Sequence, residues 1–496
     1  MIDRDKPQLP AMLYRAEQIR AMDRYAIDQL GIPGIELMRR AGMAAFAALR
    51  THWPAVRTLS VVCGSGNNGG DGYVMAHRAL EEGLDVRVYA VAPLSTLRGD
   101  ALLACQDYQA AGGTIIEFVP AAFEGAEVVV DALLGTGLDR EVLGLYAEVI
   151  RAINRFDGGV IALDIPSGLH ADSGCVMGVA VRAAVTVTFI GLKQGLFTGE
   201  GLEHCGEVVF DDLDTPAAVH HCVAPTALLM PRWQRGLPRR ICSAHKGHFG
   251  HVLVVGGEAG FSGAARLAAE AAARVGAGLV SIATRSGHAT LMNLARPELM
   301  CHGVETPAEL HPLLVRASVV AMGPGLGQSA WAGMLFAEVL ASGRPLVVDA
   351  DALNLLARNP MRRNDWILTP HPGEAARLLQ TTSTAIQRDR FAAITALVER
   401  FGGTVVLKGS GTLVLSEAGL PPAVCPLGNP GMASGGMGDV LTGVIAGLLA
   451  QGLQPAEAAA TGARLHGAAG DLAATDGERG LLAADLMGPL RLLVNR

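Results

Sequence analysis

The sequence predicts two α/β domains, each a parallel sheet with helices on both faces. Three observations lead to this prediction: a length of 496 residues, a repeated alternation of short apolar runs with longer amphipathic runs, and glycine clusters where the two kinds of run meet. A chain of this length exceeds one ordinary hydrophobic core. Apolar runs that alternate with helical patterns are typical of three-layer α/β domains, because the crossover connections of a parallel sheet are helices.

The N-terminal half supplies the first series of elements. Two helices are expected over residues 16–30 and 33–51, the second with Pro33 in its first turn. Buried strands are predicted at Thr58–Cys63, Asp85–Val91, Glu127–Asp131 and Gly159–Asp164, with helices at Tyr73–Glu82, Gly99–Ala111 and Leu145–Phe156. In such sheets ligands bind at the carboxyl ends of the strands, so the motifs that follow these strands are candidate sites.

The pattern lapses between residues 211 and 246, where the composition is that of a linker. We therefore predict one domain over 1–222 and another over 223–496. The second domain is expected to contain strands at His251–Gly256, Leu279–Ala283, Val319–Met322, Pro345–Asp349, Trp366–Thr369 and Thr404–Lys408, and helices at Gly263–Val275, Val440–Gln451, Pro455–Ala473 and Ala483–Leu493.

Composition narrows the class of protein. A formal charge of −7 without a basic stripe argues against a nucleic-acid partner. The charged N-terminus lacks the apolar core of a signal peptide, and no apolar run reaches membrane-spanning length. The eight cysteines form no C-x-x-C pair, which favours buried thiols in a reducing compartment. We expect a soluble cytoplasmic enzyme that acts on small molecules, without a membrane partner.

The motifs of the first half are glycine-rich and carry acids. The run from Gly64 to Gly72 contains G-x-G, a weak dinucleotide signal, but also two asparagines and an aspartate that can bind a sugar, an amide or a cation. A tight turn that tolerates Asn and Asp is the structural alternative. Asp131 and Asp164 end buried strands, and three such ends in one sheet favour a pocket. Asn68, Asp131 and Ser167 could offer hard oxygens to a monovalent cation.

The most specific motif of the second half is the glycine-rich run from Gly428 to Asp439, which leads into an apolar helix. Backbone N–H groups at such a helix start suit a phosphate, and an adjacent carboxylate can act as a base on a hydroxyl group. Four other patches fall at strand ends: GGEAGFSGAA at 256–265, GPGLG at 323–327, TPHPGE at 369–374 and LKGSGT at 407–412. Taken alone, His371 could be a turn residue and Lys408 a solvated strand end.

Residues 13–215 resemble the YjeF N-terminal family, the NAD(P)H-hydrate epimerases, which have a Rossmann-like fold. The matching segments are MRRAG at 38–42, GNNGGDG at 66–72, VDALLGTGL at 130–138 and DIPSGL at 164–169. The resemblance implies a K⁺ site at Asn68, Asp131 and Ser167 and proton handling by Asp164. His170 departs from the aspartate that is usual in this family. Contacts to the hydrated nucleotide are implied for Asn67, Asn68, Gly69, Gly70, Asp71, Gly135, Thr136, Gly137, Leu138, Asp139, Arg140, Glu141 and Asp164.

Residues 243–493 resemble the YjeF C-terminal, ribokinase-like domain of the ADP-dependent NAD(P)H-hydrate dehydratases. Besides the patches above, HKG at 245–247, DADALN at 349–354 and NPGMASGGMGDVLTG at 429–443 match. The resemblance implies Asp439 as the catalytic base, ADP as co-substrate and Mg²⁺ between its phosphates. The implied substrate contacts are Ala264, Gly325, His371 and Asp439, and the implied adenine-nucleotide contacts are Lys408, Gly409, Ser410, Gly411, Thr412 and Gly438.

Together the two resemblances imply a bifunctional repair enzyme that epimerises R- and S-NAD(P)HX and then dehydrates the S form, and we expect it to be a homo-oligomer. Two alternatives stay open. One is a ribokinase-like small-metabolite kinase that keeps the phosphate on its product. The other is a first half that serves only as a nucleotide-binding scaffold, although the retention of Asp71, Asp131 and Asp164 argues against it.

Overall fold

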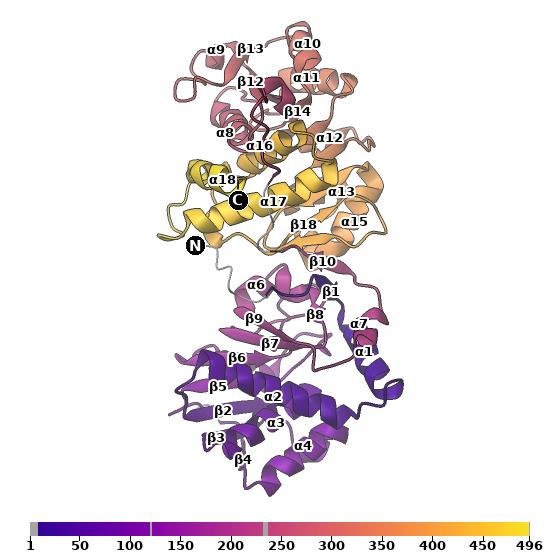
Figure 1. Cartoon of the computed structure of the whole chain (residues 1–496), viewed down its shortest axis with the longest axis vertical. Coiled ribbons are helices and arrows are strands. Elements are labelled where there is room, and N and C mark those ends of the chain that lie inside the picture. The colour runs from indigo at the N-terminus through magenta and orange to yellow at the C-terminus, as the bar shows by residue number, and fades with distance from the viewer. Residues whose placement is uncertain (1–7, 120–121, 232–236, 496) are drawn as a thin grey trace. The chain divides into compact units, whose positions relative to one another are not determined.

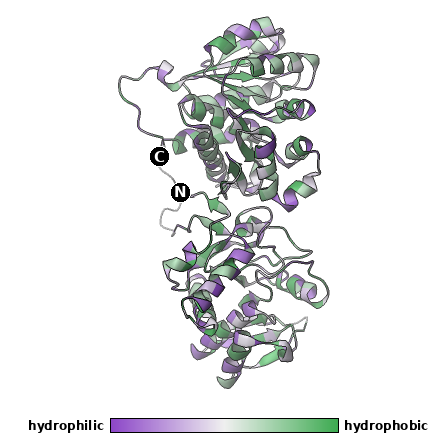
Figure 2. Ribbon diagram, turned by 90° about the vertical axis from the view of Figure 1, so that its right-hand side faces the viewer, coloured by the Kyte–Doolittle hydropathy of each residue, from purple (hydrophilic) through white to green (hydrophobic). Residues whose placement is uncertain are grey.

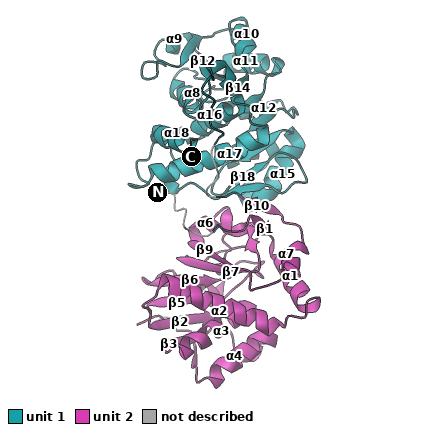
Figure 3. Ribbon diagram, viewed as in Figure 1, with its two compact units in different colours: residues 1–8, 230–496 teal, residues 9–229 magenta. Residues whose placement is uncertain are grey.

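The computed structural model describes residues 8–119, 122–231 and 237–495. The chain forms two compact units, one of residues 9–229 and one of residues 1–8 and 230–496 (Figure 3). The boundary that we predicted from the sequence, at 222/223, lies between helix α7 (Ala217–His221) and strand β10 (Ala227–Leu229). Both units have the α/β architecture that the sequence predicts.

The unit of residues 9–229 is built on a seven-stranded sheet in the order β4-β3-β2-β5-β6-β7-β9. Every neighbouring pair in this sheet is parallel. The strands are β2 (Thr58–Cys63), β3 (Asp85–Ala90), β4 (Ile115–Glu117), β5 (Val128–Ala132), β6 (Gly159–Leu163), β7 (Val185–Phe189) and β9 (Glu207–Asp211). Three further short strands lie outside this seven-stranded sheet, and among them β1 (Met12–Tyr14) pairs with β8 (Leu192–Lys193) and with β10.

Helices cover both faces of this sheet, and three of them, α2, α3 and α4, are labelled in Figure 1. Val128 and Val130 of β5 point into a core shared with helices α2 to α4, whereas Val129 points into a core shared with α5. This alternation follows from the two-residue period of a strand. The helices are α1 (Ala16–Asp28), α2 (Gly34–His52), α3 (Asn67–Glu81), α4 (Gly99–Ala110), α5 (Gly144–Ile153), α6 (Gly201–His204) and α7, with short 3-10 turns at Leu94–Thr96 and Gln194–Phe197.

The unit of residues 230–496 contains strands in the order β13-β12-β11-β14-β15-β16-β17-β18-β19. The pairs from β13 to β17 are parallel, and β18 and β19 add an antiparallel hairpin and edge that the sequence prediction lacked. The strands are β11 (His251–Val255), β12 (Leu279–Thr284), β13 (Met300–Gly303), β14 (Val319–Met322), β15 (Leu346–Val348), β16 (Trp366–Leu368), β17 (Thr404–Leu407), β18 (Thr412–Leu415) and β19 (Ala423–Cys425).

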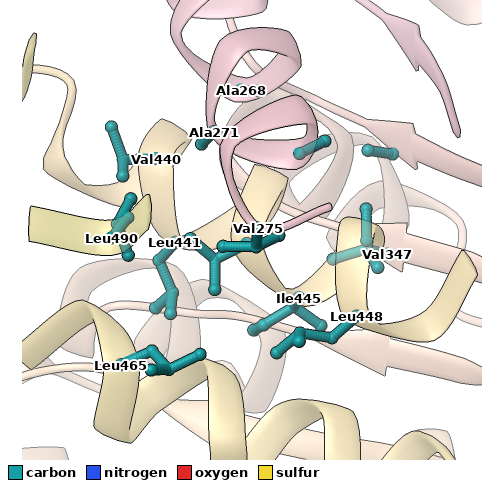
Figure 4. Packing of buried hydrophobic residues seen from close by; sticks show 14 of the residues in the cluster. Ala268, Ala271, Val275, Val347, Val440, Leu441, Ile445, Leu448, Leu465 and Leu490 are labelled. Atoms are coloured by element: carbon teal, nitrogen blue, oxygen red, sulfur yellow. The ribbon is translucent and has the colours of Figure 1, made fainter. Parts of the chain in front are cut away.

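Helices α8, α16, α17 and α18 build one core on this sheet (Figure 4). Small residues let α8 and α16 approach closely, since a Cβ atom on Gly443 would collide with the Ala268 carbonyl oxygen. The strands at the centre of each unit are hydrophobic in Figure 2. The helices are α8 (Ser262–Arg274), α9 (Ser286–Ala289), α10 (Pro307–Arg316), α11 (Ala330–Ala341), α12 (Ala350–Arg358), α13 (Pro372–Leu379), α14 (Ser383–Arg388), α15 (Arg390–Phe401), α16 (Met437–Ala450), α17 (Pro455–Ala473) and α18 (Met487–Leu493).

Four predicted helix boundaries are wrong by three residues or more, and one of them is the end of α5, which lies at Ile153 instead of Phe156. Helix α3 begins at Asn67 instead of Tyr73, and α16 begins at Met437 instead of Val440. In both cases glycines with low helix propensity occupy the first turns, where contacts with the rest of the unit override propensity. The predicted helix 483–493 is a 3-10 turn, Ala483–Leu486, followed by α18. Asp71 and Asp439, the acids of the two glycine-rich motifs, therefore lie within helices α3 and α16.

Each sheet has one point where the strand order reverses. In the first unit β2 lies between β3 and β5, and in the second β11 lies between β12 and β14. The glycine-rich motifs at 64–72 and 130–138 follow β2 and β5, and those at 256–265 and 323–327 follow β11 and β14. Open α/β sheets bind ligands at these reversals.

Candidate active sites

Helix α3 brings the asparagines of the first motif to the end of β2. Asn68 is only 8% exposed, and neither its amide oxygen nor its amide nitrogen has a hydrogen-bond partner. Buried polar groups are nearly always paired, so the Asn68 amide is free to bind a ligand. A Cβ atom on Gly135 would lie 3.3 Å from the Asn68 Cβ and 3.6 Å from Asp164 Oδ2, so Gly135, Asn68 and Asp164 adjoin one another.

Asp131 and Ser167 form a fully buried pair at the ends of β5 and β6. The Ser167 hydroxyl donates to Asp131 Oδ1 at 2.6 Å, and the Ser167 amide donates to Asp131 Oδ2 at 2.8 Å. Burial raises the pKa of Asp131 to about 6, against these hydrogen bonds. The structure thus brings these two predicted residues together and aligns their oxygens.

Asp164 has a partner that the sequence analysis missed. It adopts φ of 65°, a left-handed conformation that is rare and costly for aspartate and that concentrates at functional sites. Lys193, which is fully buried, donates a short hydrogen bond to Asp164 Oδ1. Its ammonium also donates to Thr188 Oγ1 and to the Phe189 carbonyl, both at 2.9 Å. A buried cation with three acceptors is held in one position beside the Asp164 carboxylate.

Two further acids surround this pair. Burial and then the nearby Asp164 charge raise the pKa of Asp71 well above its usual range. Burial likewise raises the pKa of Asp23 to about 6, although Lys193 opposes the shift. The buried Lys193 therefore lies near several carboxyl groups, two of which have raised pKa values. A cluster of acids of this kind can donate a proton at one atom of a substrate and accept one at another.

The other residues predicted to contact the nucleotide in this unit lie around the same end of the sheet. Gly69 and Gly70 are buried in α3, and a Cβ atom on Gly70 would meet the Met38 side chain. The segment from Thr136 to Glu141 follows β5, and beyond Leu138 its residues are exposed. His170 accepts from the Ser173 amide at 3.2 Å, so it makes a local turn contact in place of the usual aspartate.

The second unit has a charged cluster at the ends of β15, β16 and β17. Lys408 Nζ donates to Asp349 Oδ1 at 2.6 Å and lies 3.7 Å from Glu374 Oε2. Thr442 donates to the other Asp349 oxygen at 2.7 Å. Burial opposes the charge on Lys408, but Asp349 and Glu374 together raise the pKa of the lysine, so it stays protonated. Lys408 is therefore not a solvated residue at a strand end, the alternative considered from the sequence, because its ammonium is paired with Asp349.

Asp439 lies in the first turn of α16, next to this cluster. A Cβ atom on Gly438 would lie 3.3 Å from Lys408 Nζ, so the helix start and the lysine face each other. Burial, and then the charge of Asp349, raise the pKa of Asp439 to about 7, while Lys408 opposes the shift. A carboxyl group with this pKa exchanges a proton readily at neutral pH, as a general base must.

His371 occupies the N-cap of α13. Its Nδ1 accepts from the Gly373 amide at 2.9 Å, and its Nε2 lies 3.4 Å from Glu374 Oε1. Burial and the nearby Lys408 lower the pKa of His371, so the ring is neutral at pH 7 and carries its proton on Nε2. The half-exposed ring can thus offer a donor. The turn role weighed in the sequence analysis is also present, because the ring caps its own helix.

Ala264 and Gly325 adjoin each other at the reversal of the sheet. A Cβ atom on Gly325 would lie 3.1 Å from the Ala264 Cβ and would collide with the Phe261 carbonyl oxygen, so only glycine fits there with its φ of 57°. Glu258 stiffens this corner, since it accepts from Arg285 at 2.6 Å and from Ser329 at 2.5 Å. The result is a corner at which Gly325 and Ala264 bring backbone and a small side chain together.

Lys193, Asp349 and Glu374 are the central residues that the sequence analysis missed. Asp349 ends a buried strand, as Asp131 does, so the same rule could have found it. Lys193 gave no such signal, because one lysine in an apolar stretch looks like a solvated charge. Among the described residues no helix has the length and apolarity to span a bilayer, and no three or more His, Cys, Asp or Glu side chains gather in a metal-binding group.

Comparison with known proteins gives matches to both units. Residues 34–195 match the model for the YjeF-related protein N-terminus, and residues 252–490 match that for NAD(P)H-hydrate dehydratase. A Coxiella burnetii protein described as bifunctional NAD(P)H-hydrate repair enzyme Nnr is 51% identical, over 98% of this chain and 99% of its own length. An Escherichia coli protein of the same description is 44% identical, over 98% and 95%.

Among solved structures, the ADP/ATP-dependent NAD(P)H-hydrate dehydratase of Bacillus subtilis, co-crystallised with ATP and Mg²⁺, is 30% identical. It superposes with a TM-score of 0.47, over 52% of this chain and 93% of its own length.

Proposed function

Since the chain belongs to the family of bifunctional NAD(P)H-hydrate repair enzymes, we propose that it restores hydrated NADH and NADPH in two steps, each carried out by one unit. The first unit interconverts the R and S epimers at the hydrated ring carbon. The second dehydrates the S epimer at the expense of ADP. The observation that carries the proposal is that each unit places an acid with a raised pKa at the carboxyl ends of its parallel strands, beside side-chain-poor backbone.

The first step needs proton transfer at the hydrated ring. The hydroxyl gives up its proton as its C–O bond becomes a carbonyl, the bond from that carbon to the ring nitrogen breaks, and the nitrogen takes a proton. Ring closure on the other face of the carbonyl then yields the other epimer.

Asp164 is the candidate for this transfer, because the buried Lys193 holds its carboxylate in one position. Burial raises the pKa of a second carboxyl group, Asp71, well above its usual range, so Asp71 holds a proton more readily than an exposed aspartate. We therefore assign Asp71 the role of proton donor and Asp164 that of proton acceptor.

The fit of a K⁺ ion rests on the oxygens that this unit provides. The unpartnered Asn68 amide oxygen and the Asp131–Ser167 pair are hard oxygen donors, which suit an alkali cation. When bound, K⁺ would supply a fixed positive charge near the phosphates of the substrate. We assign the site to Asn68, Asp131 and Ser167, and the phosphate and sugar contacts to Asn67 to Asp71 and Gly135 to Glu141.

The second step must make hydroxide a better leaving group. Asp439 removes the proton of the substrate hydroxyl, whose oxygen then takes the terminal phosphate of ADP and releases AMP. The N–H groups of Gly435 to Gly438 and the Lys408 ammonium stabilise the charge on the transferred phosphoryl group. Phosphate then leaves with the former hydroxyl oxygen, and loss of a ring proton restores NAD(P)H.

The remaining assignments follow from the positions of the residues. Ala264, Gly325 and His371 would hold the nicotinamide end of the substrate, with the His371 Nε2 proton as donor. Lys408 to Thr412 and Gly438 would hold ADP. Asp349, Glu374 and Asp439 all lie close enough to Lys408 to raise its pKa, and carboxyl groups gathered in this way suit an Mg²⁺ ion that arrives with the phosphates of ADP.

One assay tests the proposal. Purified protein is incubated with mixed-epimer NADHX, ADP, Mg²⁺ and K⁺, and NADH is followed by its absorbance. Complete conversion is expected. Conversion that stops at the S fraction would contradict the epimerase assignment, and a phosphorylated product without NADH would favour a small-metabolite kinase instead. Full activity of the Asp439→Ala variant would refute the assigned base.

A further inference from the structure

A buried arginine lies behind the turn that links β17 to β18. Arg390, the first residue of α15, is 1% exposed. Its guanidinium donates to the carbonyl oxygens of Leu407 at 3.2 Å, Lys408 at 3.4 Å and Gly411 at 3.3 Å. It also donates to Gln387 Oε1 at 2.8 Å. The planar fork of the guanidinium can hold several acceptors at once, which a lysine ammonium does with less geometric control.

These hydrogen bonds decide which way the peptide groups of the turn point. In a trans peptide the C=O and the following N–H point in opposite directions. With the Lys408 carbonyl turned toward Arg390, the Gly409 N–H points away from it. The Lys408 N–H is already used, because it donates to the Pro370 carbonyl at 2.9 Å. The Gly409 N–H is therefore directed to the side opposite the guanidinium.

Gly409 itself is fitted to this arrangement. Its φ is 136°, and a Cβ atom would lie 2.8 Å from a guanidinium nitrogen of Arg390. A side chain here would strain the backbone and displace the arginine. The absence of a side chain at Gly409 thus makes room for the Arg390 guanidinium.

We propose that Arg390 is a positioning residue for the nucleotide: it draws the carbonyl oxygens of Leu407, Lys408 and Gly411 away from the phosphates of ADP and leaves the Gly409 N–H facing them. Carbonyl oxygens near a phosphate repel it, whereas N–H groups bind it. Arg390 acts through the backbone and does not contact the nucleotide. This inference rests on the proposed assignment of residues 408–412 to ADP.

The test is the affinity for Mg-ADP, measured by titration calorimetry on the full chain, for wild type, Arg390→Met, Arg390→Lys and the control Arg388→Met. Arg388 is the exposed last residue of α14. We expect the Kd for ADP to rise at least about tenfold, or about 1.4 kcal/mol, in Arg390→Met. The rise should be smaller in Arg390→Lys and absent in Arg388→Met. The KM for NADHX and the rate of epimerisation should not change, which a general loss of structure would not allow.

An unchanged ADP affinity in both Arg390 variants would overturn the inference, as would an equal rise in the KM for ADP and for NADHX. If Arg390→Met loses its thermal unfolding transition, Arg390→Lys alone decides between the two outcomes. A wild-type protein that binds ADP but forms no NADH would contradict the proposed function without contradicting the role of Arg390. Wild type that binds no ADP would refute the nucleotide assignment and this inference together.

Discussion

Replacing Asp439 with asparagine should abolish dehydration and, at alkaline pH, stabilise the protein. The pKa of Asp439 rises from its ordinary 3.8 to about 7, with burial as the first cause. The unfolded chain ionises this carboxyl group above pH 3.8, whereas the folded chain does so only near pH 7. The folded state therefore loses stability as pH rises through this window, and the loss is complete above pH 7. Asparagine carries no charge at any pH in this range, so the variant does not lose this stability.

The size of the effect follows from the shift. At about 1.36 kcal/mol per unit of pKa, the upper bound is about 4 kcal/mol. Asp439 is half-buried, so solvent screens part of the charge, and we expect about 2 kcal/mol at pH 8. For a domain of this size that is a gain of about 4–8 °C in Tm.

Scanning calorimetry at pH 4 and pH 8 measures this gain. Asp439→Asn should unfold at the wild-type temperature near pH 4 and several degrees higher at pH 8. The matched control is Asp476→Asn, at an exposed acid in the turn after α17. A Tm for Asp439→Asn that equals or falls below that of wild type at pH 8 would refute the reasoning that the carboxylate is held at a cost in stability.

The remaining predictions concern both activities. The kcat/KM of dehydration should rise with pH up to about 7, because Asp439 must be ionised to act as a base, and a profile that is flat between pH 5 and 8 would contradict this. Lys193→Met should slow epimerisation by about 10²–10³ while dehydration of pure S-NADHX continues, as chromatography of the two epimers would show. Asn68→Ala should raise the K⁺ concentration needed for half-maximal epimerisation, measured against choline chloride, and an unchanged K⁺ response would count against the cation site. Gly438→Ala should raise the KM for ADP about tenfold, because the new Cβ crowds Lys408 Nζ at 3.3 Å at a cost of roughly 1.4 kcal/mol, and an unchanged KM would contradict that contact.

The parallel core of each sheet was predictable because its strands are buried on both faces and read as continuous apolar runs. β2 and β14 have the same bounds as the strands predicted from the sequence. The short strands β18 and β19 and the starts of α3 and α16 were not predictable in this way. Their residues have weak or opposing propensities, and pairing or packing with distant segments fixes their conformation.

The residues of the candidate sites likewise include some that the sequence revealed and others that only the structure revealed. Glycines and acids that directly follow apolar runs, such as Asp131 and Asp164, were identified from the sequence. Lys193 was not, because its role depends on the left-handed turn at Asp164 and on a strand that lies far along the chain. Arg390 was missed for the same reason, since its acceptors are backbone carbonyls, which no sequence motif records.

The fate of the substrate hydroxyl oxygen tests the central claim most directly. NADHX labelled with ¹⁸O at that hydroxyl is converted by the protein with unlabelled ADP, and the released phosphate is analysed by mass spectrometry. Phosphoryl transfer to the hydroxyl, followed by loss of phosphate, predicts one ¹⁸O atom in each phosphate released and none in AMP. Unlabelled phosphate, with the ¹⁸O in water, would contradict the account.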